Sequence, residues 1–259
     1  MDHLRELASH SHLILSFARR DLRAKYKQTI FGAAWAVIQP LSLMVVFTLV
    51  FSMFARVDSE GVPYPIFAYS ALIFWTFFSS CVSQGTIAMT ANAALVRKIW
   101  FPRETLLLAV MISAFIDLAV AATVLAGMYV YYQIAISWTF LWVIPLLALQ
   151  IVFTLATILV TSAVHVHFRD IGHALPLLLQ LWMFATPVAY PLASVPEWLR
   201  PLYLLNPMAG IVDGYRRVLL RGLSPDLAYL GVALVVGVFG CAGAYLLFKR
   251  AERTFADVI

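Results

Sequence analysis

Charged residues are scarce in this chain: Asp, Glu, Lys and Arg make up 12% of its 259 residues, about half the share found in soluble domains. Cysteine is also scarce, and both cysteines, Cys81 and Cys241, lie in apolar stretches. Two cysteines exclude a framework of several disulfides. Apolar residues supply 63% of the sequence. This composition excludes an ordinary soluble domain and predicts an all-α protein that spans a membrane several times.

The sequence also lacks the motifs of several enzyme classes. None of its lysines follows a glycine-rich loop, which excludes ATP binding by a P-loop, and neither Gly-x-Ser-x-Gly nor His-Glu-x-x-His occurs. His165 and His167 alternate, so on a helix they point apart and make poor metal ligands. We therefore expect no catalytic residue, cofactor or metal in this chain. A membrane-embedded acyl- or glycosyltransferase that uses Asp117 with a histidine is the enzyme alternative.

Long runs without charge are present instead, and about 20 apolar residues are enough to cross a bilayer. The sequence predicts six spans in a permease domain of residues 28–259, at residues 33–55, 68–92, 106–131, 138–164, 171–190 and 227–248. Thirteen of the 18 Lys and Arg residues fall in the tails and loops of one side, which predicts that both termini are cytoplasmic. The basic residues form short clusters between spans, a pattern that does not favour nucleic acid as a partner.

Residues 1–27 predict a separate element, an amphipathic helix on the cytoplasmic surface of the membrane. Apolar residues recur along it at helical spacing, and basic residues crowd its second half. These basic residues are expected to contact lipid phosphates: Arg19, Arg20, Arg23, Lys25 and Lys27. Ordinary anchoring of the topology by positive charge is the alternative, with equal weight.

The connection before the last span, residues 191–226, is too apolar for a solvated loop. Within it, residues 194–222 contain two helical pieces divided by Asn206 and Pro207, and each piece is too short to cross the membrane. They predict a re-entrant helical hairpin on the outer side. A single amphipathic helix lying on the surface is the alternative.

Asp117 is the one acidic residue inside a predicted span, where a charge costs roughly 2.5 kcal/mol or more. It must therefore face the helix bundle or water. A proton relay would need a second acidic or histidine side chain in the membrane, and no other predicted span supplies a carboxylate. A structural hydrogen bond to a neighbouring helix is the simpler interpretation.

Two groups of aromatic residues recur at helical spacing in the first two spans. The first group is Phe47, Phe51 and Phe54, and the second is Phe74, Trp75 and Phe78. Stripes of this kind usually pack against other helices or face lipid. A path for sugars is the competing interpretation, because sugar rings stack on flat aromatic faces without a fixed register.

Four short motifs occur in order along the chain. Residues 25–40 join a basic and aromatic elbow to the first span; His167-Phe168-Arg169-Asp170-Ile171 precedes the fifth; Thr186-Pro187-Val188-Ala189-Tyr190-Pro191 ends it; and Leu205-Asn206-Pro207-Met208 lies before the last. In this order and spacing, they resemble the permeases of polysaccharide-exporting ABC transporters, the Wzm-like family.

The resemblance implies a homodimeric permease that works with two separate ATPase subunits, which bind ATP and Mg²⁺. It implies a coupling segment at residues 94–105, whose charged residues would contact the ATPase: Arg97, Lys98, Arg103 and Glu104. It also implies outward export of a lipid-linked polysaccharide, such as O antigen, capsule or teichoic acid, across the inner membrane of a bacterium. An ABC permease for drugs or small lipids is the alternative within the same architecture.

Overall fold

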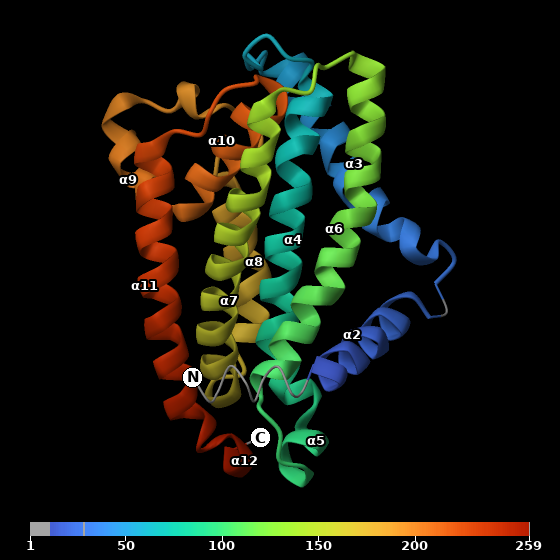
Figure 1. Ribbon diagram of the computed structural model, residues 1–259, viewed down its shortest axis with the longest axis vertical. Helices are drawn as coiled ribbons and strands as arrows, with labels where there is room; N and C mark the ends of the chain where they lie inside the picture. Colours follow the sequence, from blue (N-terminus) through green and yellow to red (C-terminus); the bar gives the residue numbers. More distant parts are fainter. Residues whose placement is uncertain (1–10, 28, 259) are drawn as a thin grey trace.

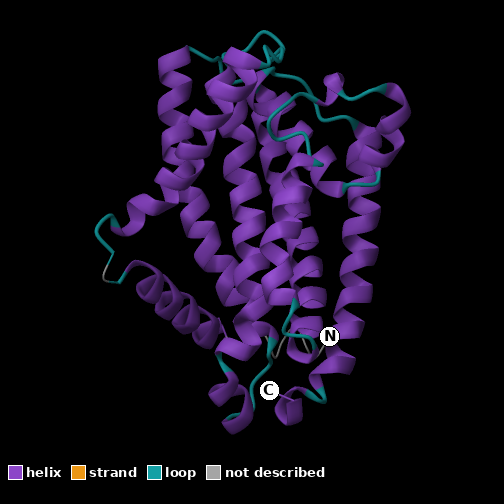
Figure 2. Ribbon diagram, turned by 180° about the vertical axis from the view of Figure 1, so that it is seen from behind, coloured by secondary structure: helices purple, strands orange, loops and turns teal. Residues whose placement is uncertain are grey.

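The computed structural model describes residues 11–27 and 29–258, and every regular element in these ranges is a helix (Figure 2). Five helices are long and apolar enough to cross a bilayer: Gly32–Phe54, α4 (Tyr64–Ala91), α6 (Glu104–Tyr132), Trp138–His167 and α11 (Leu227–Glu252). At about 1.5 Å per residue, each exceeds the roughly 30 Å of the hydrocarbon core. The predicted all-α, polytopic class is confirmed.

Two of these long helices are built from shorter elements. The first joins η1 (Gly32–Ala34), α3 (Trp35–Phe47) and the π-helical η2 (Thr48–Phe54). The fourth joins η3 (Trp138–Trp142) and α7 (Val143–His167). Gly32 has a φ of +51°, a value that suits glycine and lets the chain turn from the membrane surface into the first span.

Helix α4 lies at the centre of the bundle, against α3, α6, α7 and α8 (Ile171–Phe184) (Figure 1). A glycine permits its close approach to α7, because a Cβ at Gly85 would lie 2.3 Å from Cγ2 of Ile158. The next residue, Thr86, donates a hydrogen bond of 2.7 Å to Thr161 of α7. Small residues and hydroxyl pairs of this kind hold helices together where lipid offers no hydrophobic driving force.

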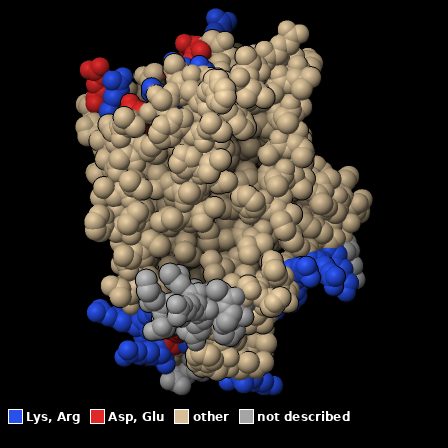
Figure 3. Space-filling view, viewed as in Figure 1, with Lys and Arg blue, Asp and Glu red and all other residues tan. Residues whose placement is uncertain are grey.

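The charges lie where a membrane protein places them. On the face seen in Figure 3, Lys, Arg, Asp and Glu gather at the two ends and leave an uncharged band between them. Helices α2 (Ser11–Tyr26), α5 (Ala93–Lys98) and α12 (Phe255–Val258) lie at one end of the bundle (Figure 1). Ile14 and Ala18 of α2 pack against Ala109 of α6. The predicted amphipathic helix thus includes α2, and its first ten residues lie outside the described ranges.

The fifth predicted span, residues 171–190, is helical only in part. Helix α8 (Ile171–Phe184) has 14 residues, or about 21 Å, and non-helical turns follow it. Apolar residues continue to Tyr190, so the span predicted from the sequence extends six residues beyond the end of the helix at Phe184. The break falls at Thr186-Pro187, where proline removes a backbone donor.

The connection before α11 begins with short elements and ends in a buried helix. Elements η4 (Leu192–Ser194), η5 (Glu197–Leu199) and α9 (Arg200–Leu204) come first. Helix α10 (Pro207–Leu220) then packs against α4, α7 and α11 at the end opposite α5, with 12 of its 14 residues buried. Asn206 caps it by accepting a bond of 3.2 Å from the Met208 amide. Of the two helical pieces expected in residues 194–222, the first is shorter than the pattern suggested.

Candidate functional site

Helix α5 and the residues after it form the tip of the end that carries α2 and α12. Arg97 and Lys98 are exposed there, together with two apolar neighbours, Ile99 (58% exposed) and Trp100 (78% exposed). We name these four residues the coupling surface. They line one cleft with Arg253, which follows α11. Sequence reasoning named the two basic residues and missed Trp100, although a tryptophan two residues after a basic pair was the available signal.

The other two charged residues of the coupling segment point inward. Glu104 is 4% exposed, and Lys249 of α11 lies 2.6 Å from its carboxylate. Arg103 donates to the backbone oxygen of Glu252, and its guanidinium lies 5.5 Å from the ring centre of Phe255. A buried carboxylate cannot touch a partner, so the assignment of Glu104 as an ATPase contact is corrected. Arg103 and Glu104 instead fasten the coupling segment to the ends of α11 and α12.

The second polar site lies where α2 meets the first span. Lys25 and Tyr26 both contact the carboxylate of Asp117 in α6, one on each oxygen. Burial, the hydrogen bond to Asp117 and its charge all raise the pKa of Tyr26, which keeps the phenol protonated as a donor. The expected structural hydrogen bond of Asp117 is present, but its partners come from the surface helix and not from a spanning helix.

The remaining basic residues of α2, and Lys27 directly after it, make no contact with Asp117. Arg19, Arg20, Arg23 and Lys27 border a shallow depression on the helix surface. Arg20 pairs with Asp21 at 2.9 Å, and both are partly exposed. Their positions suit contact with lipid phosphates and equally suit anchoring of the topology by positive charge. Both interpretations of these basic residues therefore stay predictions.

The aromatic residues of α4 lie inside the bundle. Phe74 stacks on Tyr215 with ring centres 3.5 Å apart, and Phe78 stacks on Phe153 at 5.8 Å. Trp75 is 4% exposed. This placement favours packing over a substrate path for Phe74, Trp75 and Phe78.

The aromatic residues of the first span differ along its length. Phe47 is buried against Phe51 and Phe184, at 5.5 and 6.4 Å between ring centres, whereas Phe54 is 83% exposed. Phe51 is half-buried. A substrate path therefore stays a prediction that concerns Phe51 and Phe54 above all.

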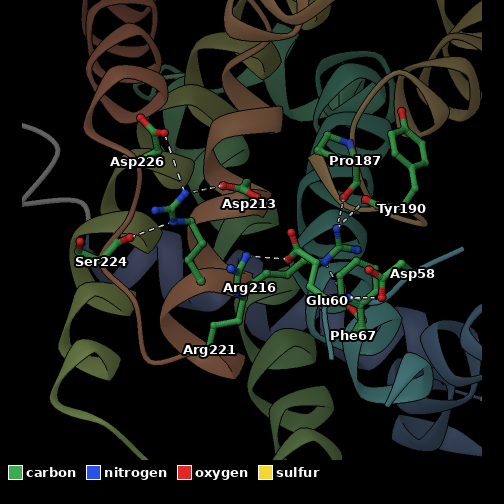
Figure 4. Close-up of polar contacts among 11 residues, drawn as sticks. Asp58, Glu60, Phe67, Pro187, Tyr190, Asp213, Arg216, Arg221, Ser224 and Asp226 are labelled. Atoms are coloured by element: carbon green, nitrogen blue, oxygen red, sulfur yellow. Dashed lines mark hydrogen bonds and ion pairs between the residues drawn. The ribbon is translucent and has the colours of Figure 1, made fainter. Parts of the chain in front are cut away.

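At the opposite end, Arg216 of α10 is the polar residue that sequence reasoning missed (Figure 4). Its side chain is 2% exposed, and it donates to the carbonyl oxygens of Phe67 (3.3 Å), Pro187 (2.5 Å), Tyr190 (2.9 Å) and Val188. Its guanidinium also lies 3.7 Å from the ring centre of Phe67. The count of Lys and Arg residues in the predicted loops assigned Arg216 to the outer side of the membrane. No motif in the neighbouring sequence indicates that its side chain is buried.

Other side chains, in addition to Arg216, donate hydrogen bonds to the carbonyl oxygens of the non-helical segment after α8. Three further side chains complete the set: Tyr64 bonds to Ala189 O (2.6 Å), Asn206 to Ala185 O (3.2 Å) and Tyr190 to Phe184 O (2.7 Å). The amide of Val188 bonds to Thr186 O at 2.6 Å. Every carbonyl oxygen of residues 184–190 thus has a donor, which is what allows unwound backbone inside a membrane protein.

Surface ion pairs close the same end. Arg217 lies 4.0 Å from Asp213 and 3.9 Å from Asp226, and it donates to Ser224 O at 3.0 Å. Arg221 pairs with Glu60 at 2.8 Å, between α10 and the loop before α4 (Figure 4). The loops of this end are therefore tied to α10 at several points.

The enzyme alternative finds no support in this geometry. Asp117 is held by Lys25 and Tyr26, whereas His167 contacts Ala163 O (3.1 Å) and the Thr254 hydroxyl (3.2 Å) at the end of α7. Within the described ranges, no three His, Cys, Asp or Glu side chains come together as metal ligands would.

Comparisons with known proteins agree with the resemblance found in the motifs. The profile of the ABC-2 type transporter family matches residues 12–220. An O-antigen export system permease protein RfbA of Myxococcus xanthus is 30% identical over 259 residues, which cover 99% of this chain and 98% of that protein. One of the same name from Klebsiella pneumoniae is 26% identical, with 95% of each chain covered.

A more distant relative is the polysialic acid transport protein KpsM of Escherichia coli. It is 23% identical over 242 residues, which cover 91% of this chain and 93% of that protein. The match to the family profile extends from α2 to the end of α10. It therefore includes the contact of Asp117 with α2 and the site around Arg216. The chain is a member of the ABC-2 type transporter family, a multi-pass membrane permease.

Proposed function

We propose that this chain is the permease subunit of an ABC exporter that moves a lipid-linked polysaccharide, such as O antigen, outward across the bacterial inner membrane. The observation that carries this proposal is similarity along nearly the whole chain to O-antigen export permeases. The similarity to a polysialic acid transporter supports the same class of substrate, a charged or neutral polysaccharide.

A separate ATPase would supply the energy. The sequence has no P-loop, so ATP and Mg²⁺ would bind to that partner. The coupling surface supports this role, because it combines two exposed cations with an exposed tryptophan at one tip of the molecule. Tryptophan and arginine are the residues that most often carry the binding energy of interfaces.

A second copy of the chain would complete the conduit. One chain has too few spans to enclose a polymer, and α8 is shorter than the hydrocarbon core is thick. The outward face of α8 is apolar, with Leu177 and Leu181 60% and 58% exposed. A two-fold dimer through α8 and the first span would cover this face and place Phe51 and Phe54 near the axis.

The cytoplasmic membrane surface is where a lipid-linked substrate would approach. The basic residues of α2 border a shallow depression, and at headgroup depth they would attract the phosphate that joins lipid to sugar. The flat ring of Trp35, 46% exposed at the start of the first span, offers a sugar a stacking surface.

The proposal is tested by deleting this chain from its host. Surface polysaccharide should disappear, lipid-linked polysaccharide should accumulate inside the cell, and the intact chain should restore export. The purified chain should hydrolyse no ATP alone and should gain hydrolysis only with a P-loop ATPase partner. Unchanged surface polysaccharide in the deletion strain, or hydrolysis by the isolated chain, would overturn the proposal.

A further inference from the structure

The contact between α2 and Asp117 closes one side of a cavity at the start of the first span. Seven of its lining residues are polar or aromatic: Lys25, Trp35, Gln39, Thr76, Phe77, Ser80 and Asp117. They come from α2, the first span, α4 and α6, so any movement of α2 would change the cavity wall. The cavity is therefore built partly from the one element that lies on the membrane surface.

Asp117 binds α2 through two side chains and no backbone atom. Its side chain is 15% exposed and that of Lys25 is 32% exposed. After Ala18, no residue of α2 is buried, so Lys25 and Tyr26 are what fasten the second half of α2 to α6. A single ion pair that reaches solvent can exchange partners, because its net worth is on the order of 1 kcal/mol or less.

Three other polar side chains of the cavity are available to a ligand. Gln39, Thr76 and Ser80 make no side-chain hydrogen bond to another residue of the described ranges. They lie on the same cavity as the cation of Lys25 and the exposed ring of Trp35. Hydroxyl and amide groups beside a flat ring bind sugars, and an ammonium group binds phosphate.

We propose that Asp117 is an internal competitor for the substrate's phosphate: without substrate it holds Lys25 and Tyr26, and a sugar-bearing lipid phosphate takes Lys25 from it. This inference rests on the proposed function and adds a positioning residue to it. When Lys25 turns to the phosphate, Tyr26 alone holds the second half of α2 to Asp117, so this half can move from α6, and the sugar next to the phosphate reaches Trp35, Gln39 and Ser80. Asp117 thereby sets how much substrate is needed to release α2.

Two substitutions separate this role from a purely structural one, because they break the same contact from opposite sides. Asp117→Asn removes the competing charge and leaves Lys25 for the phosphate. Lys25→Gln removes the cation that the phosphate needs. Both should release α2, but they should have opposite effects on the response to substrate. Asp117→Glu, which keeps the charge, is the matched control.

The experiment uses the permease reconstituted with its ATPase in vesicles. Probes are a polyprenyl phosphate that carries one sugar, the same glycoside without phosphate, and phosphatidylglycerol alone. Spin labels at Ala24→Cys and Val130→Cys, both exposed, report the distance from α2 to α6 in a chain whose two native cysteines are replaced by alanine. ATP hydrolysis reports the response to each probe.

For Asp117→Asn, the concentration of the phosphate-bearing probe that gives half-maximal stimulation should fall by up to about fivefold, because the released state no longer has to be populated by substrate. For Lys25→Gln, stimulation should be lost. Both variants should show, without probe, the distances that the unsubstituted chain shows only with it. Asp117→Glu should behave like the unsubstituted chain, and the glycoside without phosphate should do nothing.

Equal behaviour of Asp117→Asn and Lys25→Gln would overturn the inference, as would unchanged distances in both. Release by phosphatidylglycerol alone would also overturn it, because the cavity would then respond to any lipid phosphate. Failure of the proposed function looks different: the unsubstituted complex itself would give no stimulation with the sugar-bearing probe.

Discussion

The two ends of the molecule treat their polar groups in opposite ways. At the end that carries α10, Arg216 gives its donors to four backbone carbonyls, and Arg217 and Arg221 are paired with carboxylates. At the end that carries α5, Arg97, Lys98 and Trp100 are exposed. The first end is closed by bonds within one chain, and the second keeps groups available for another molecule.

The difference has a physical basis in the partners that each charge has. Arg216 is bound by backbone oxygens of a packed segment, which cannot leave without unfolding it. Asp117 is bound by two side chains of a surface helix, which can turn away. Buried charge in the first case fixes structure, whereas exchangeable charge in the second suits binding.

The largest effect is expected from Arg216→Met. The substitution keeps apolar volume but leaves the carbonyl oxygens of Pro187, Val188 and Tyr190 without that donor in a site that excludes water. The free energy of unfolding should fall by about 3–5 kcal/mol, as when one partner of a buried charge interaction is removed. Arg216→Lys should recover little, because one ammonium group cannot reach the same carbonyls. Thermal unfolding of the purified permease measures both.

Arg217→Gln is the matched control for Arg216. Its side chain is 30% exposed, so losing its ion pairs should cost no more than about 1 kcal/mol. Equal stability of the Arg216→Met and Arg217→Gln variants would contradict the inference that Arg216 stabilises the end of the bundle that carries α10.

The next effect concerns Trp100, where binding and not stability should change. Trp100→Ala should weaken association with the ATPase by on the order of 2 kcal/mol, because an exposed tryptophan at an interface centre is the usual anchor. Trp198, 77% exposed at the opposite end, provides the control Trp198→Ala. Titration of the ATPase onto the reconstituted permease measures both, and an equal loss for the two variants would remove Trp100 from the interface.

Much of the fold could be predicted from local patterns, and the long-range pairs could not. Uncharged runs and the turn at Gly32 are visible in sequence because a span needs only length and apolarity. The partner of Asp117 lies 92 residues away at Lys25, and a donor to the unwound segment lies 125 residues from it at Tyr64. Neither spacing follows a helical period, so only the packed structure brings them together.

The same limit explains the correction at Glu104. From the sequence, Glu104 is predicted to lie in a charged loop, a position that is typical of surface contacts. Its side chain is instead directed inward by the ion pair with Lys249 at the end of α11. The early end of α8 is similar. Hydropathy continues past Phe184, and the unwound backbone is stable because side chains distant in sequence, such as Tyr64, Asn206 and Arg216, donate to its carbonyl oxygens.

A smaller effect is expected from reversing the two exposed cations of the coupling surface. Arg97→Glu with Lys98→Glu should slow association with the ATPase several-fold and remove much of its salt dependence, because such charges act mainly on the rate of encounter. Insertion should stay normal, since eleven of the thirteen positive charges that are predicted to be cytoplasmic are unchanged.

The control for this pair is Arg200→Glu, an exposed reversal at the opposite end. Stopped-flow mixing of the ATPase with the permease at two salt concentrations measures the rates. If the paired reversal and the control bind at the same rate, the charges of α5 do not steer the partner.

The smallest change in stability separates the two aromatic groups. Phe74→Leu removes the stack on Tyr215, and the free energy of unfolding should fall by about 0.5–1.5 kcal/mol beyond the change in buried area. Because Phe74 is buried, the amount of folded permease should fall, and surface polysaccharide should fall in proportion. Phe54→Leu touches an exposed ring and should leave the amount of folded permease unchanged.

If Phe54 lines the path of the sugar chain, surface polysaccharide per folded transporter should fall in Phe54→Leu and stay constant in Phe74→Leu. Leucine keeps an apolar surface at both positions but removes the flat face on which a sugar ring stacks. Quantitative blotting of the permease beside surface polysaccharide gives the ratio. A ratio that falls for Phe74→Leu would place the path inside the bundle along α4, and a ratio that falls for neither variant would remove both rings from the path.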